Sequence, residues 1–403
     1  MTCPKLYLGL GTEWDGHGKQ VPWFDVDVER KTPPSHVKSG ENTTTDKLHA
    51  EKQDDTHMID TTDVTNTNLL RLNLTASHCL PQKSFVFIKV HKAGSHNTAC
   101  ILQRFVWSNN LTIVLPMNPV KSGLKTHDLN YVNLPFYPPY DVMLHHLPYN
   151  RAKMANVMQK NVVFIAILRY PLSHLKSIYN YRHLDRRFGL PLEGYLSNPK
   201  YLFGTILYKT RNWQAFMMGI PPEYSGNNKK AQARILELGK EFDHVMILEY
   251  YDESLILLKR KLCWKLQDIL YDKQIRNYRS YSYKKTDIPE KLKENHKRSS
   301  DLDYMLYSYF NKTLWREILK EGEDFQNEVE LFRRVNYKVN LFCNSPVNYS
   351  DYVIEATTWN AKFTVDQTLC SELKMLRIDW DKRFFARQGK VPEGMGAHGM
   401  LDQ

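Results

Sequence analysis

The chain is organised around Ser84-Phe-Val-Phe-Ile-Lys-Val-His-Lys-Ala-Gly-Ser-His-Asn-Thr98, which continues as Ala99-Cys-Ile-Leu-Gln-Arg-Phe105. Residues 84–90 are rich in β-branched and aromatic side chains, which is typical of a buried strand. In residues 98–107 the apolar side chains recur at helical spacing. The pattern predicts a strand, a tight turn and a helix.

The predicted turn, His91-Lys-Ala-Gly-Ser95, carries the residues of an anion site. It offers a cation, a glycine and a hydroxyl at a helix start, where backbone N–H groups attract negative charge. A strand, a glycine turn and a helix also occur in many α/β proteins, so a purely structural turn stays an alternative. The pattern G-x-x-x-x-G-K-[ST] is absent and Lys92 precedes Gly94, which disfavours a nucleotide kinase.

A second candidate anion site follows another apolar run. Residues 161–168 are typical of a strand buried on both faces, and the run ends at Arg169. Pro171 suits the start of a helix, on which Ser173 and Ser177 lie one turn apart. An arginine at a strand end can hold a phosphate with a serine of the next helix, or it can cap or pair structurally. Two such sites predict a ligand with two separated phosphate-like groups.

Two more buried strands are predicted, at residues 140–150 and 244–248, and residues 111–115 form a short candidate strand. The first of these strands ends on His145 and His146. A histidine pair at a strand end can be catalytic, structural or merely exposed.

Composition limits the class of binding partner and suggests how the chain divides into domains. The 403 residues contain 55 Lys and Arg against 44 Asp and Glu, a net charge of +11, which favours a polyanionic or phosphorylated partner. No long basic block is interleaved with aromatic residues, so nucleic acid is disfavoured as a partner. Residues 1–78 are polar, which predicts a stem or a disordered region, and residues 79–403 are predicted to form the folded domain.

Cysteine and glycosylation patterns favour a secretory-pathway lumen. There, Cys343 and Cys370 are candidates for a disulfide. The sequence shows no secretory signal peptide and no run of about 18 apolar residues, so a membrane anchor is not visible in it. Sequons of the N-x-[ST] type lie at Asn42, Asn73, Asn110, Asn311 and Asn348.

Two motifs resemble the sulfuryl-donor site of the Golgi carbohydrate sulfotransferases. Lys89-Val-His-Lys-Ala-Gly-Ser95 resembles their 5′-phosphosulfate loop, and Ile167-Leu-Arg-Tyr-Pro171 with Ser177 resembles their 3′-phosphate motif. More narrowly, the chain is similar to the galactose-3-O-sulfotransferases from about Cys79 to the C-terminus. The stretches that carry this similarity are Phe87-Ile-Lys-Val-His-Lys, Arg104-Phe105, Asn110-Leu-Thr-Ile-Val-Leu-Pro116, His145-His146, Asp252-Glu-Ser-Leu-Ile-Leu-Leu258 and Tyr309-Phe-Asn-Lys-Thr-Leu-Trp315.

The resemblance implies an α/β, P-loop-type sulfotransferase fold with a central, mostly parallel sheet flanked by helices. It implies sulfuryl transfer from 3′-phosphoadenosine 5′-phosphosulfate (PAPS) to the 3-hydroxyl of a terminal β-galactose. The acceptor would be a galactosylceramide-like glycolipid or a glycoprotein glycan. The resemblance also implies a membrane-associated protein of the type II kind, located in the Golgi lumen and membrane. Because PAPS carries an activated group, no metal is expected. The alternatives are a uronyl-type carbohydrate 2-O-sulfotransferase and an inactive, glycan-binding relative.

The resemblance also implies roles for individual residues. Lys92 is expected at the bridging oxygen of PAPS, and His146 is expected as the base, with His91 as its rival. His96 and Asn97 stand where the family loop usually continues with Ser or Thr, which keeps the inactive relative open. The residues expected to bind PAPS are Lys92, Ala93, Gly94, Ser95, His96, Asn97, Thr98, Arg169 and Ser177.

Two stretches are expected near these groups. Residues 209–219 resemble a family segment expected near the acceptor, although Met and aromatic residues at such spacing also suit a core. Residues 277–285 are basic with interleaved tyrosines, and they form either a lid over the nucleotide or a solvated loop.

Overall fold

A computed structural model describes residues 79–116, 139–203, 210–273, 283, 286–345 and 351–389, with the backbone of residues 12–14 and 20–22. The chain divides into two compact units, Met1–Leu80 and Pro81–Gln403. In the first unit, β1 (Thr12–Trp14) and β2 (Gln20–Pro22) pair antiparallel. The stem predicted for residues 1–78 stays a prediction, and most of the predicted lid lies outside the described residues.

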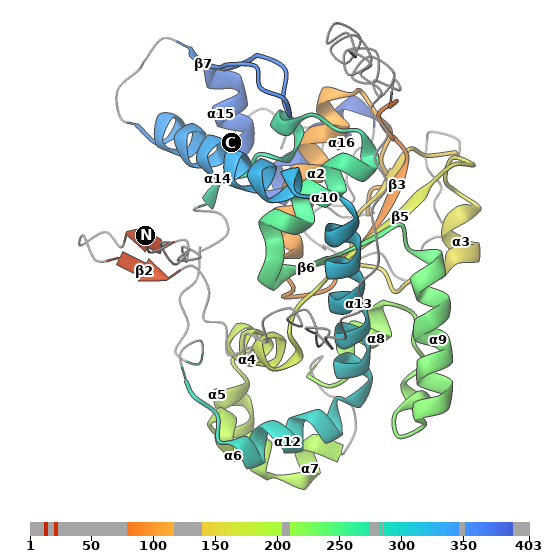
Figure 1. Ribbon diagram of the computed structural model, residues 1–403. Coiled ribbons are helices and arrows are strands. Elements are labelled where there is room, and N and C mark those ends of the chain that lie inside the picture. Colours follow the sequence, from red (N-terminus) through yellow and green to blue (C-terminus); the bar gives the residue numbers. More distant parts are fainter. Residues whose placement is uncertain are drawn as a thin grey trace, which may run out of the picture. The chain divides into compact units, whose positions relative to one another are not determined.

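Four parallel strands form the central sheet of the second unit, in the order β4-β3-β5-β6 (Figure 1). They are β3 (Phe85–Ile88), β4 (Val142–Met143), β5 (Val163–Leu168) and β6 (His244–Ile247). All residues of β3 and β6 are buried, and so are those of β5 beyond Val163, as their apolar runs require. The predicted α/β fold with a parallel central sheet is confirmed.

Helices flank this sheet. α2 packs against α15, α16 and a short 3-10 turn, whereas α13 packs against α8, α9 and β6 (Figure 1). The helices are α2 (Ser95–Ser108), α3 (Arg151–Ala155), α4 (Pro171–Tyr181), α5 (Leu184–Phe188), α6 (Leu192–Ser197), α7 (Pro199–Phe203), α8 (Trp213–Met217), α9 (Asn228–Glu241), α10 (Tyr251–Leu262), α12 (Glu290–Ser299), α13 (Asp301–Lys320), α14 (Asp324–Cys343), α15 (Gln367–Lys374) and α16 (Arg377–Arg387). The remaining elements are the 3-10 turns η1 (Pro222–Tyr224), η2 (Leu248–Tyr250) and η3 (Leu266–Ile269), and a hairpin of β7 (Tyr352–Ile354) and β8 (Phe363–Val365). Within the described residues, no helix has the length and apolar character needed to cross a bilayer.

The strand order selects one edge of the sheet for a ligand. β4 follows β3 along the chain and pairs on one side of it, whereas β5 pairs on the other side. The connections therefore diverge at the carboxyl ends of β3 and β5, which is where open α/β sheets bind ligands. The loop after β3, the histidine pair after β4 and Arg169 after β5 all follow carboxyl ends of neighbouring strands.

Two of the predicted strands are shorter than expected. Residues 111–115 make only a single bridge, between Ile113 and Val142, and β4 ends at Met143. Side chains replace strand partners here: Asp141 accepts from the Thr112 N–H at 2.8 Å, and Gln388 accepts from the Ile113 N–H at 2.9 Å. The histidine pair consequently lies in the turn after β4 and not on the strand itself.

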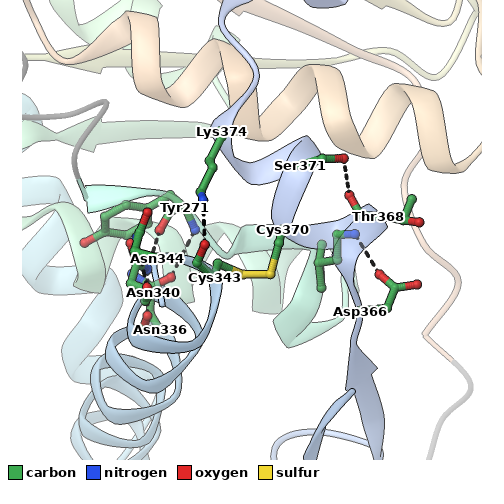
Figure 2. Close-up of a disulfide and its surroundings, with 11 residues drawn as sticks. Tyr271, Asn336, Asn340, Cys343, Asn344, Asp366, Thr368, Cys370, Ser371 and Lys374 are labelled. Atoms are coloured by element: carbon green, nitrogen blue, oxygen red, sulfur yellow. Dashed lines mark hydrogen bonds between the residues drawn. A yellow bond between two sulfur atoms is a disulfide. The ribbon is translucent and has the colours of Figure 1, made fainter. Parts of the chain in front are cut away.

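The predicted disulfide between Cys343 and Cys370 is present and joins the end of α14 to α15 (Figure 2). Lys374 of α15 also donates to the carbonyl of Cys343 (Figure 2). By loop entropy, a crosslink across 27 residues stabilises the folded chain by about 3 to 4 kcal/mol. The disulfide thus fastens the C-terminal helices to the helices around the sheet.

Candidate active site

Four consecutive carbonyls of the loop after β3 each accept a hydrogen bond from a side chain. The pairs are His146 Nδ1 to Lys89 (2.6 Å), Ser95 Oγ to Val90, His174 Nε2 to His91 (2.8 Å) and Arg169 Nη1 to Lys92 (3.2 Å). A carbonyl oxygen is the negative end of the peptide dipole. Binding these oxygens to donors therefore restrains the groups that would repel an anion, and it holds the loop in one shape.

The N-terminus of α2 is built to face negative charge. Its cap residue, Gly94, is left-handed with φ +76°, and among the described residues no side chain caps the helix. Its first turn contains no acidic residue. The backbone N–H groups of that turn and the helix dipole make this end positive.

Gly94 is required for two separate reasons. Its positive φ is unfavourable for any residue with a Cβ, and a Cβ built there would lie 2.4 Å from Cδ1 of Leu248. The close approach brings the loop after β3 against the turn after β6. Any other residue type requires the Leu248 side chain to shift and places a Cβ on a left-handed backbone.

Gly94→Ala is expected to lower the free energy of unfolding by about 1 to 3 kcal/mol and to weaken nucleotide binding at the loop at least tenfold. Chemical denaturation and calorimetry with 3′-phosphoadenosine 5′-phosphate measure the two effects. Gly189→Ala is the matched control, since Gly189 has φ +63° and no described atom within 4 Å of a Cβ. Equal nucleotide binding by both variants would contradict a role for the loop.

Lys92 is strained and lies next to an aromatic ring. Its φ of +61° is unusual for a residue with a side chain, and such backbone strain concentrates at functional sites. Its ammonium Nζ lies 4.4 Å from the ring centroid of Tyr181 on α4, a cation–π contact. The side chain is half-buried, so the cation stands at the border between the loop and solvent.

The loop lies in a positive electrostatic environment. Burial, then the charge of Arg377, lowers the pKa of Lys89 to about 8. Desolvation, then the charges of Lys89, Arg377 and Lys92, lowers the pKa of His96 to about 4, so that His96 is neutral at neutral pH. These cations disfavour further positive charge and favour a bound anion.

His91 and His146 are stacked. Their ring centroids lie 3.6 Å apart with an interplanar angle of 12°. His146 Nδ1 carries a proton, because its partner, the Lys89 carbonyl, can only accept; the neutral ring therefore has its lone pair on Nε2. His91 shows the opposite pattern, since its Nδ1 accepts from Trp213 Nε1 at 3.4 Å and its Nε2 carries the proton. When both rings are neutral, His146 is therefore the one that can accept a proton at Nε2.

Arg169 is tied to the loop after β3 by its hydrogen bond to the carbonyl of Lys92. Its backbone is held on both sides by Gln214 of α8, which accepts from the Arg169 N–H and donates to its carbonyl, each at 2.8 Å. Ser177 is only 5% exposed on α4, whereas Ser173, one turn earlier, is half-buried.

The remaining predicted loop residues mostly face the protein. Ala93 is fully buried, and the Ser95 hydroxyl donates its single proton to Val90. Asn97 and Thr98 both contact the hydroxyl of Tyr251 on α10, at 3.4 Å and 3.1 Å. These side chains therefore stabilise the loop, whereas the sequence suggested that they donate to a ligand. The donors that the geometry offers to a ligand here are the backbone N–H groups at the start of α2.

Sequence reasoning missed His174 as part of this site, and it expected Trp213 and Gln214, within residues 209–219, near the acceptor and not as contacts of the loop residue His91 and of Arg169. His174 is buried, and burial lowers its pKa to about 3, so the ring stays neutral. Its Nε2–H donates a hydrogen bond to the His91 carbonyl. The one available signal was the helical position of His174 beside Ser173, on the helix that follows Arg169. Residue type alone does not show that a histidine donates into a neighbouring loop.

The sequence model of the galactose-3-O-sulfotransferase family matches residues 41–351. The chain is 27% identical over 290 residues to galactosylceramide sulfotransferase of Homo sapiens, covering 68% of this chain and 67% of that protein. It is 31% identical over 249 residues to human galactose-3-O-sulfotransferase 3, covering 59% of this chain and 57% of that protein. With human galactose-3-O-sulfotransferase 2 it shares 29% identity over 285 residues, or 65% and 68% of the two chains.

Proposed function

This chain belongs to the galactose-3-O-sulfotransferase family, and on that basis we propose that it transfers a sulfuryl group from PAPS to the 3-hydroxyl of a terminal β-galactose. The acceptor is a galactosyl glycolipid, such as a galactosylceramide, or a glycoprotein glycan. One observation carries the proposal beyond family membership. In the loop after β3, four backbone carbonyls each accept a hydrogen bond from a side chain, and the loop leads into the uncapped N-terminus of α2 near the carboxyl ends of β3 and β5.

The residues present fit the donor nucleotide. Gly94 admits a close approach of backbone to an anion, and the first turn of α2 offers N–H groups to the 5′-phosphosulfate. Arg169, held between Gln214 and the loop, is assigned to the 3′-phosphate together with Ser177. Because Ser177 is buried, its contact with a phosphate requires side chains along α4 to shift. PAPS supplies an activated sulfuryl group when bound.

The chemistry that follows uses two side chains. The galactose 3-hydroxyl gives its proton to Nε2 of His146, and its oxygen forms a bond to sulfur as the bond between sulfur and the bridging oxygen breaks. Lys92 stabilises the negative charge on the departing phosphate oxygen. The products are the sulfate ester and 3′-phosphoadenosine 5′-phosphate. In-line positioning by the loop supplies much of the remaining rate, as in phosphoryl transfer.

Metal dependence and location are part of the proposal. Over the described ranges, no group of three or more His, Cys, Asp or Glu has an arrangement that could hold a metal ion. That the transfer requires no metal stays a prediction, tested by adding a chelator. The five sequons and the disulfide support the Golgi lumen as the compartment, with the enzyme acting at the membrane.

Arg169→Ala is expected to weaken binding of 3′-phosphoadenosine 5′-phosphate at least tenfold, because it removes charge-assisted hydrogen bonds to the 3′-phosphate. Calorimetry on the full chain measures this. Arg151→Ala is the matched control: Arg151 also donates to a carbonyl, that of Glu241, and contacts Phe164 at the opposite end of β5. Absence of nucleotide binding by the folded wild-type chain would contradict the transferase and favour the inactive relative.

Activity is tested with radiolabelled PAPS and two acceptors, galactosylceramide and a glycan with terminal β-galactose. Periodate then identifies the position, because a 3-O-sulfated terminal galactose retains no vicinal diol and resists cleavage. A labelled product that survives periodate supports the proposal. Transfer only to uronic-acid acceptors would replace it with the uronyl 2-O-sulfotransferase.

A further inference from the structure

A buried carboxylate outside the loop joins three elements around it. Asp381 of α16 is fully buried. It accepts from Gln103 Nε2 of α2 at 2.7 Å and contacts His145 Nε2 through both oxygens, at 3.1 Å and 3.2 Å. It also pairs with Arg377, one turn earlier on its own helix. The mechanism above uses none of these four residues.

Two of the three partners of Asp381 lead to reacting groups. His145 is adjacent to His146, and Gln103 lies on the helix whose first turn forms the anion site. His145 and Gln103 are themselves buried, so their hydrogen bonds to Asp381 are not replaced by bonds to bulk water. The carboxylate therefore fixes the turn that carries the base relative to the helix that carries the sulfuryl-donor site.

Asp381 does more than form an ion pair within its own helix. A pair with Arg377 alone, at a spacing of four residues, would need no bond to His145 or Gln103. Moreover, the charges of Arg377 and Asp381 both act on the buried ammonium of Lys89, at the start of the loop. The network thus spans the end of β3, the turn after β4, and α16.

The carboxylate reaches this position on a segment beyond the family match. That match ends at residue 351, whereas α15 and α16 begin at Gln367 and Arg377. The disulfide fastens α15 to α14 (Figure 2), and α16 lies along α2 (Figure 1). The C-terminal helices therefore pack against the site, and Asp381 of α16 contacts Gln103 and His145 there.

We propose that Asp381 is a positioning residue for the transfer: through His145 and Gln103 it holds the turn carrying His146 against the loop carrying Lys92. The inference rests on the proposed function. It predicts a loss in turnover without a loss of nucleotide affinity. The reason is that Asp381 contacts His145, the neighbour of the base, and contacts none of the groups assigned to PAPS.

Asp381→Asn is expected to lower kcat at least 30-fold, with the KM for PAPS and the Kd for 3′-phosphoadenosine 5′-phosphate changed less than threefold. Rates are normalised to the nucleotide-binding fraction, so that misfolded protein does not count. Glu328→Gln is the matched control, since Glu328 is fully buried on α14 and pairs with Lys259 at 2.7 Å and Arg260 at 2.6 Å. It should lose stability but keep kcat within twofold.

A second variant separates positioning from charge balance. Asp381→Asn with Arg377→Gln removes the uncompensated buried cation, so it should recover stability but not kcat. Recovery of kcat in the double variant would overturn the proposal, and so would a parallel loss of kcat and nucleotide affinity.

A third readout does not depend on activity. In chain labelled with ¹⁵N-histidine, Asp381→Asn should shift the ring nitrogen signals of His145 and His146, and Glu328→Gln should leave them unchanged. If the wild-type chain transfers no sulfuryl group, the proposed function fails. The spectra then still decide whether Asp381 orients the histidine turn: unshifted signals overturn it and shifted signals support it.

Discussion

Lys92→Met is expected to lower kcat about 10²- to 10³-fold, the range found when a group that stabilises transition-state charge is removed. Methionine keeps a long, flexible, apolar stem but has no cation for the departing phosphate oxygen. The fold should persist, because the bond that Arg169 makes to residue 92 uses the backbone carbonyl. Initial rates with labelled PAPS at saturating acceptor measure the change.

Lys230→Met is the control for this substitution. Lys230 also lies near an aromatic ring, with its Nζ 6.0 Å from the centroid of Tyr224, but it belongs to α9, away from the strand ends. Its variant should keep the wild-type kcat. A Lys92→Met rate within fivefold of wild type would show that another group stabilises the leaving oxygen.

The fold was predictable where sequence patterns are local. Mainly apolar runs identified β3, β5 and β6, because a strand buried on both faces is filled mostly by apolar side chains. His244 at the start of β6 is a buried polar exception. The start of α4 was predictable from Pro171, whose fixed φ suits the first helical position. The short β4 was overestimated, because side chains such as Asp141 and Gln388 bind backbone groups that a longer strand would pair.

The site was predictable in part for the same reason. Lys92, Gly94 and Arg169 stand next to strand ends, and in a parallel sheet those ends meet. The bond from Arg169 to the Lys92 carbonyl joins the two motifs that the sequence singled out. Asp381 was not predictable, since it meets His145 across 236 residues and neither neighbourhood carries a pattern for that contact. Nor could residue type show that Ser95, Asn97 and Thr98 would brace the loop with their side chains.

His146→Asn is expected to lower kcat about 10²- to 10⁴-fold, the usual contribution of a general base. The asparagine amide can occupy the place of Nδ1 and still donate to the Lys89 carbonyl, so the loop keeps that brace. What is lost is the lone pair on Nε2 that accepts the proton of the sugar hydroxyl. Nucleotide affinity should stay within threefold of wild type, as measured by calorimetry, which locates the defect in the transfer step.

His91→Asn provides the comparison that assigns the base. An asparagine oxygen can accept from Trp213 as Nδ1 of His91 does, so that hydrogen bond is retained while the ring stacked on His146 is lost. Because the neutral His91 ring carries its proton on Nε2, its loss should lower kcat by less than about tenfold. A larger loss for His91→Asn than for His146→Asn would reverse the assignment. In that case the tautomers would have to exchange on acceptor binding, with His91 turning away from Trp213 before the proton moves.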